Sequence, residues 1–186
     1  MNTQFRIMAC LVAALVSGAA NAVASSAPNA QGAGGQVNFK GTITDASCNV
    51  DAGSKGQDVD LGTWDKSYFS GAGTETTKKL FHIKVTDCPD SVKQVSVLFD
   101  GQKDSSMQEL LALTSGGATG VGIKLYEDDQ TSRVKLGTAS KKQNVIVGPQ
   151  NNGSAELTFY ADYVSTGAGI TAGPANATAD FNMIYN

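Results

Sequence analysis

The sequence predicts an all-β domain of the sandwich type. Apolar residues alternate with polar ones along several short stretches, which is the period expected of strands with one buried face. Clusters of glycine, serine, asparagine and aspartate separate these stretches, as at residues 51–54, 70–73, 115–117 and 151–154. About seven or eight short strands spaced in this way favour two packed sheets.

Five stretches carry the alternation most clearly, and we expect a strand in each. In chain order, their apolar faces are Val37, Phe39, Gly41 and Ile43; Phe81, Ile83 and Val85; Val95, Val97 and Phe99; Val121, Ile123 and Leu125; and Leu157, Phe159, Ala161 and Tyr163. The one helical signal lies at residues 106–113, where Ser106 and Glu109 have the spacing of a capping box. We expect one or two helical turns there.

Residues 175–185 form the most regular segment of the chain. Apolar side chains occupy every second position, at Ala175, Ala177, Ala179, Phe181, Met183 and Tyr185. Terminal residues normally fray unless a neighbour holds them. A strand with a complete apolar face this close to Asn186 is therefore unusual.

Residues 1–22 have the composition of a secretory signal peptide. Arg6 precedes an apolar run over residues 7–16, and small residues lead to an Ala-x-Ala sequence at residues 20–22. The run is too short to span a bilayer comfortably, and no later run approaches about 18 apolar residues. We expect an exported chain that is not membrane-embedded; a weak membrane anchor is the alternative. Residues 23–35, which are small and polar, should be mobile.

Cys48 and Cys88 are the two cysteines outside the signal peptide. An even pair in an exported chain predicts one disulfide. A structural zinc site is the rival interpretation. It is weaker, because the chain has one histidine, His82, and no Cys-x-x-Cys spacing.

Composition argues against several function classes. The 186 residues carry 14 Lys and Arg against 17 Asp and Glu, so the basic surface of a nucleic-acid-binding protein is missing. His82 is out of phase with its apolar neighbours and so predicted on the outer face of a strand, which leaves nucleophilic catalysis without a base. Residues 127–129 are acidic but lack the spacing of a calcium loop, and we expect a hairpin tip there. Trp64, the single tryptophan, should be packed rather than part of a sugar-binding platform. We expect no enzyme activity and no cofactor or metal.

Three stretches together resemble the pilin subunits of chaperone–usher fimbriae, most closely the major subunit of type 1 pili. The first runs from Gly35 to Cys48 and continues through residues 50–54 and 59–62. The second is residues 81–88, which resemble the strand that carries the family's second disulfide cysteine. The third is Gly173 followed by the alternating segment up to the penultimate Tyr185, which is similar to the family's chaperone-recognition pattern.

The resemblance implies an incomplete immunoglobulin-like sandwich that lacks its last strand. A periplasmic chaperone would first lend a strand to the resulting groove. At an outer-membrane usher, the N-terminal extension of an identical or related subunit would then replace it. This is strand addition to a sheet edge. The product would be a head-to-tail fimbria on the cell surface that supports adhesion and has no enzymatic activity, with this chain as the major rod subunit.

The same resemblance divides the chain into a signal peptide at residues 1–22, a donor-strand extension at 23–39 and a pilin domain at 40–186. Stepping back by two from Phe39 gives the donor face: Gln31, Ala33, Gly35, Val37 and Phe39. The residues expected at the chaperone and acceptor edge are Gly173, Ala175, Ala177, Ala179, Phe181, Met183 and Tyr185.

Several alternatives remain open at this point. Val37 and Phe39 could belong to the chain's own first strand and never leave it. The subunit could be a minor adaptor instead of the major rod subunit, or a carbohydrate-binding adhesin module. A sandwich enzyme of the copper–zinc dismutase type is the third class, but its metals need several histidines.

Overall fold

The computed structural model describes residues 34–43, 47–148, 152–167 and 169–186. The chain divides into two units, residues 1–42 and residues 43–186. In the first unit, residues 34–42 form no helix or strand and all their side chains are exposed. The strand expected from Val37 to Ile43 is therefore not formed. The predicted signal peptide lies outside the described residues.

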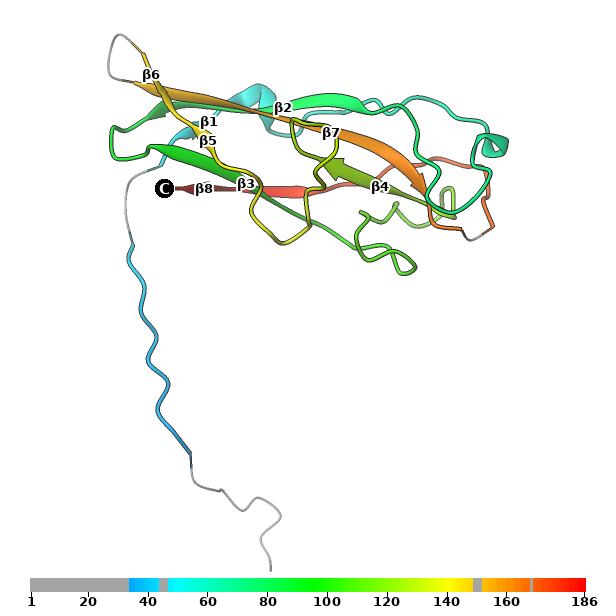
Figure 1. Ribbon diagram of the computed structural model, residues 1–186, viewed down its shortest axis with the longest axis horizontal. Coiled ribbons are helices and arrows are strands. Elements are labelled where there is room, and N and C mark those ends of the chain that lie inside the picture. The colour runs from blue at the N-terminus through cyan, green and yellow to red at the C-terminus, as the bar shows by residue number, and fades with distance from the viewer. Residues whose placement is uncertain (1–33, 44–46, 149–151, 168) are drawn as a thin grey trace, which may run out of the picture. The chain divides into compact units, whose positions relative to one another are not determined.

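The described residues of the second unit form eight strands and two short 3-10 helices (Figure 1). The strands are β1 (Asn49–Val50), β2 (Lys79–Cys88), β3 (Gln94–Asp100), β4 (Val121–Tyr126), β5 (Gln143–Asn144), β6 (Ile146–Val147), β7 (Gly153–Ser165) and β8 (Asp180–Tyr185). The 3-10 helices are η1 (Ala52–Ser54) and η2 (Lys66–Tyr68), and the described residues contain no α-helix. The strands predicted around residues 83, 97, 123 and 159 are confirmed as β2, β3, β4 and β7.

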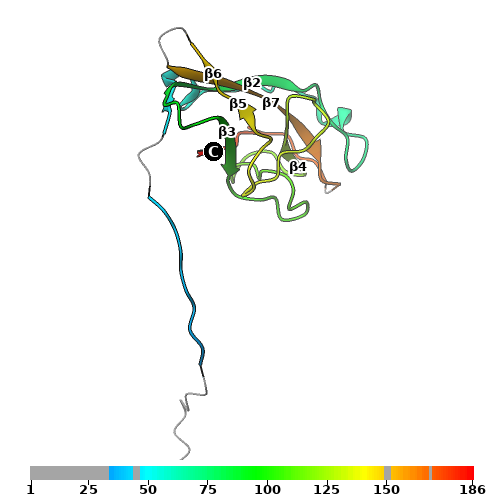
Figure 2. The same ribbon diagram turned by 60° about the vertical axis from the view of Figure 1, so that its left-hand side comes forward.

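Two antiparallel sheets make up this unit. The larger has the order β1-β2-β7-β4, with β6 also paired to β7, and the smaller has the order β5-β3-β8. Figures 1 and 2 show β3 beneath the layer formed by β2 and β7. The inward faces meet in an aromatic cluster in which the ring of Phe99 lies 4.9 Å from that of Phe159 and 6.0 Å from that of Phe81. The predicted sandwich is confirmed. Among the described residues, no helix is long and apolar enough to cross a membrane.

The prediction of a helix at residues 106–113 is wrong. The carboxylate of Asp104 accepts hydrogen bonds from the backbone amides of Ser106 and Met107, and the amide of Leu110 donates to the Met107 carbonyl. These bonds close a tight turn instead of a helix. Leu111 then pairs with Ile123 of β4 through two backbone hydrogen bonds. Local capping signals are overridden here because both leucines enter the core.

A disulfide joins Cys48 to Cys88, as predicted, at a sequence separation of 40. Both cysteines are buried. Cys48 immediately precedes β1 and Cys88 ends β2, so the bond fastens the short edge strand β1 to its longer neighbour.

Two polar predictions can be compared with the structure. His82 lies on the outer face of β2, as expected, where its Nδ1 is 3.0 Å from a carboxylate oxygen of Glu156. The acidic segment does form a turn, closed by a hydrogen bond from the Glu127 amide to the Ser132 carbonyl. Glu127 itself is buried, however, and accepts a hydrogen bond from the amide of Lys141. Burial raises the pKa of its carboxyl.

A carboxyl group is also buried on the outer face of the larger sheet. Asp162 of β7 is 0% exposed, and its register partner on β4 is Lys124. One carboxylate oxygen is 3.3 Å from the hydroxyl of Tyr126, and the other has no hydrogen-bond partner among the described residues. Lys78 and Lys124 instead reach Glu75, at 3.2 and 2.8 Å. Burial and then repulsion from Glu75 raise the pKa of Asp162 to about 7.

This carboxyl should make stability depend on pH. Its folded pKa, about 7, exceeds its ordinary value of 3.8, so the folded state binds the proton more tightly. The stabilisation is full below the ordinary value and is lost as pH rises through 7, by at most about 1.4 kcal/mol per pH unit. Asp162→Asn should therefore be more stable than the wild type at pH 8, with the gain shrinking towards pH 4. Urea unfolding of both proteins, purified in the same assembly state, measures this. Parallel pH profiles would contradict it.

Removing the disulfide should destabilise the same unit. A loop of this length lowers the entropy of the unfolded chain by the equivalent of about 4 kcal/mol in the chain-entropy model. The double variant Cys48→Ser/Cys88→Ser should unfold at a lower urea concentration than the oxidised wild type. The reduced wild type serves as the control and should behave like the variant. An unchanged midpoint would show that the bond contributes nothing to folding.

Candidate functional site: an open groove between the two sheets

A groove of about 1030 Å³ opens between the two sheets of the second unit. One bank is formed by residues 56–69, which follow η1, and the other by residues 170–181, which lead into β8. Its floor is made of core side chains from β2, β3, β4 and β7. They include Phe81, Ile83, Phe99, Ile123, Leu125 and Ala161.

The C-terminal bank has a strict alternation of exposure. Ala175, Ala177, Ala179 and Phe181 are half-buried and line the groove, whereas the residues between them are exposed. This is the period-2 face predicted from the sequence, although a paired strand begins only at Asp180. Residues 175–179 thus form an extended wall of methyl groups.

Gly173 marks the start of this wall and has a steric reason to be glycine. A Cβ atom there would lie 2.9 Å from the backbone nitrogen of Ala118 and 3.0 Å from the carbonyl carbon of Gly117. The two segments are held together by a hydrogen bond from the Ala118 amide to the Pro174 carbonyl. Any larger residue would push the bank away from residues 117–118.

Two tyrosine hydroxyls tie the C-terminal bank to the larger sheet. Tyr163 of β7 donates a hydrogen bond of 2.7 Å to the carbonyl of Ala175. Tyr185 of β8 donates one of 3.2 Å to the carbonyl of Cys48, next to β1. Burial raises the pKa of both phenols, so they stay protonated and can donate. These two bonds fix the spacing of the sheets beside and below the groove.

The opposite bank was not predicted from the sequence. Leu61 is buried, and the Trp64 indole donates to the Leu61 carbonyl at 2.9 Å while its ring packs 4.8 Å from that of Tyr68. The prediction that Trp64 is packed is confirmed, but Trp64 also lines the groove. Asp65 caps η2 through the Ser67 amide. Apolar residues in this bank do not alternate regularly with polar ones. The only sequence signal for it is therefore the irregularly spaced apolar residues over 59–69.

Backbone groups on both banks are left without partners. β8 is the edge strand of the smaller sheet and β1, only two residues long, is an edge of the larger. Among the described residues, the backbone amides of 57–61 and 175–179 donate to no other group. An unpaired edge beside apolar side chains is suited to receive another strand. In the described part of the chain no three metal-ligating residues cluster, and the groove has no catalytic constellation.

The structure places the predicted site residues in three groups. Gly173, Ala175, Ala177, Ala179 and Phe181 line the groove, whereas Met183 and Tyr185 pack against the core further along β8. On the predicted donor face, Gly35, Val37 and Phe39 are exposed. The remaining two, Gln31 and Ala33, lie outside the described residues.

Comparison with known proteins identifies the family. The family model described as "Fimbrial protein" matches residues 37–186. The chain is 34% identical over 186 residues to a fimbrial subunit type 1 of Salmonella typhimurium, covering 97% of this chain and 98% of that one. It is 36% identical to the probable major fimbrial subunit LpfA of Escherichia coli O157:H7, covering 84% of this chain and 86% of the relative.

Solved structures agree with these relatives. A type I fimbria protein of Burkholderia pseudomallei is 34% identical and superimposes with a TM-score of 0.56, covering 80% of this chain and 96% of that one. The P pilus rod subunit PapA shares the fold with a TM-score of 0.62 at 22% identity, covering 75% of this chain and 99% of that one. The chain therefore belongs to the fimbrial protein family, as an immunoglobulin-like, non-enzymatic structural subunit of a surface fimbria.

Proposed function

We propose that this subunit polymerises by donor-strand exchange, with the open groove as the acceptor. The observation that carries the proposal is the groove itself, whose apolar floor lies between two banks with unpaired backbone amides. An extended segment from another subunit would supply both the backbone partners and the apolar side chains that the groove lacks. Its backbone would pair with the banks, and every second side chain would cover the floor.

The donor segment is the extension at residues 23–39, which follows a signal peptide at 1–22 and precedes the pilin domain at 40–186. Val37 is 71% exposed and Phe39 is 93% exposed, which is unusual for side chains of this kind. Burial in a neighbour's groove would stabilise the contact by about 1.5–3 kcal/mol for each. Gly35, Ala33 and Gln31 would continue the same face, with Gly35 where the groove is shallow.

A head-to-tail contact of this kind does not close on itself and so builds an open filament. Before assembly, the same groove would be exposed and prone to aggregation. A periplasmic chaperone that lends a strand along residues 173–185 solves this problem, and an outer-membrane usher would bring the donor of the next subunit to the groove. The methyl wall of Ala175, Ala177 and Ala179 supports a close approach by such a strand.

Within the fibre, we assign the chain to the major rod subunit. Relatives that share almost its whole length include a type 1 fimbrial subunit, and LpfA is described as a probable major subunit. The alternative is a minor adaptor. Mass spectrometry of sheared surface fibres distinguishes them, because a rod subunit dominates the fibre mass.

Deleting residues 23–39 while keeping the signal peptide should stop polymerisation. The truncated subunit retains its groove but has no strand to donate, so it should still bind the chaperone and be absent from the interior of fibres. Co-purification with the chaperone and immunoblotting of sheared fibres measure the two properties. Normal incorporation of the truncated chain along the fibre would overturn the assignment of the donor.

Single substitutions should separate the two faces of the donor. Phe39→Ala removes an apolar side chain that would enter the groove and should weaken each subunit contact by about tenfold or more. Asn38→Ala is the matched control, because Asn38 lies between Val37 and Phe39 in the same segment and points to the other face of an extended strand. Resistance of purified fibres to guanidinium dissociation measures both variants. Equal resistance of the Phe39→Ala fibres and the wild type would contradict the proposed register.

A further inference from the structure

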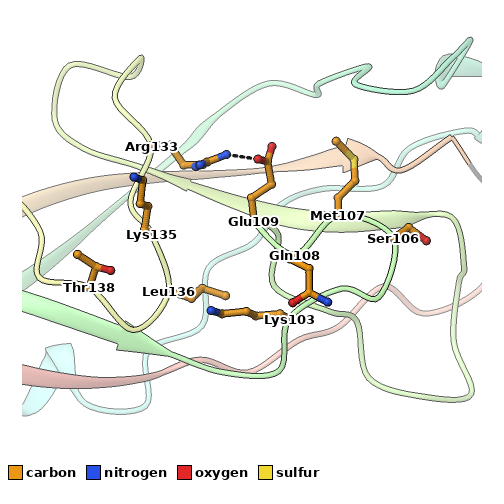
Figure 3. Close-up of a pocket in the computed structure, with 9 residues that line it drawn as sticks. All are labelled: Lys103, Ser106, Met107, Gln108, Glu109, Arg133, Lys135, Leu136 and Thr138. Atoms are coloured by element: carbon orange, nitrogen blue, oxygen red, sulfur yellow. Dashed lines mark hydrogen bonds and ion pairs between the residues drawn. The ribbon is translucent and has the colours of Figure 1, made fainter.

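A second pocket, of about 560 Å³, lies in the folded unit and shares no lining residue with the groove. It is formed by the turn at residues 103–109 and by residues 133–138 (Figure 3). The turn is the segment in which a helix was expected. The two hydrogen bonds that the Asp104 carboxylate accepts close the turn found in place of the helix, and this turn forms one wall of the pocket.

Positive charge gathers at this pocket in a chain whose net charge is −3. Lys103, Arg133 and Lys135 line it, against a single acid, Glu109. Figure 3 shows Lys135 next to Arg133, which is paired with Glu109, and Lys103 on the opposite side of the pocket. In the described part of the molecule, neither lysine forms an ion pair, and the Nε of Arg133 is buried without a hydrogen-bond partner. Three cations here are thus compensated by one carboxylate.

The remaining lining groups are neutral donors and apolar surface. Ser106, Gln108 and Thr138 present hydroxyl and amide groups, and no described residue forms a hydrogen bond with these side chains. Met107 is half-buried and Leu136 is 7% exposed, and these two apolar side chains lie on different sides of the pocket (Figure 3). Cations, neutral donors and an apolar patch together match a hydroxylated ring that carries an oxyanion.

We propose that this pocket binds an acidic sugar, with the carboxylate or sulfate held by Lys103, Arg133 and Lys135. The ring hydroxyls would bond to Ser106, Gln108 and Thr138, and an apolar edge of the sugar would lie on Leu136, beside Lys103. One open pocket gives weak binding. A fibre repeats the pocket in every subunit, so multivalent attachment to a surface that carries many acidic glycans would be far stronger.

Purified fibres provide the test, with 6′-sialyllactose, a sulfated heparin hexasaccharide and lactose as immobilised probes. Wild-type fibres should retain at least one of the two acidic probes and not lactose. Retention of sialyllactose shows that a carboxylate is sufficient, whereas retention of the hexasaccharide alone indicates that sulfate is required. The variant Lys103→Gln/Lys135→Gln should weaken that retention by about tenfold or more.

The matched control is Lys55→Gln/Lys93→Gln, which removes the same charge from two exposed lysines outside the pocket. It should leave retention within about twofold of the wild type, whereas a general attraction to the fibre surface would fall equally in both variants. Equal loss, failure of the wild type to retain either acidic probe, or equal retention of lactose would each overturn the proposal. Fibre yield, measured first for each variant, separates a lost pocket from lost assembly.

Discussion

The main constraint on the structure is that its two sheets do not close over each other along one side, where the groove lies. Phe81, Ile83 and Phe99 belong to the core, yet they also form the floor of a groove, because residues 56–69 and 170–181 stand apart above them. Along the groove Ala175, Ala177, Ala179 and Phe181 are only half-buried, and exposed apolar area of this kind is unfavourable in water. Tyr163 and Tyr185 hold the C-terminal bank in place, and the disulfide fastens β1 to β2 on the other side.

In most domains the same contacts hold the sheets together and bury the apolar surface, whereas here these two roles are separate. The sheets are held by local devices, namely the disulfide, the tyrosine hydroxyls and the close approach at Gly173, so the frame does not rely on a filled core alone. Burial of the remaining apolar surface is left to an incoming strand. The family membership of the chain and the shape of the groove therefore have one physical explanation, which is a fold that keeps its shape while one strand position stays open.

Much of this could be predicted from sequence, and the failures have physical causes. Alternation located β2, β3, β4 and β7 because each has one face in the core, and the cysteine count gave the disulfide. The same period puts Asp162 between two inward residues and so on the outer face, but alternation could not show that its side chain is buried there, against Tyr126 and near Glu75. The bank at residues 56–69 has no period to detect. The capping signal at Ser106 did not produce a helix, because Leu111 pairs with Ile123 of β4 instead.

The pairing of β3 with β8 has a kinetic consequence. It joins Val95 to Tyr185 and Asp100 to Asp180, so the smaller sheet forms only when segments separated by most of the domain have met. Contacts between such distant positions require a large loop to close and slow the search for the native state. Until these contacts form, the partly folded chain exposes more apolar surface than the folded domain does. That unfinished intermediate is the species most exposed to aggregation while the domain folds.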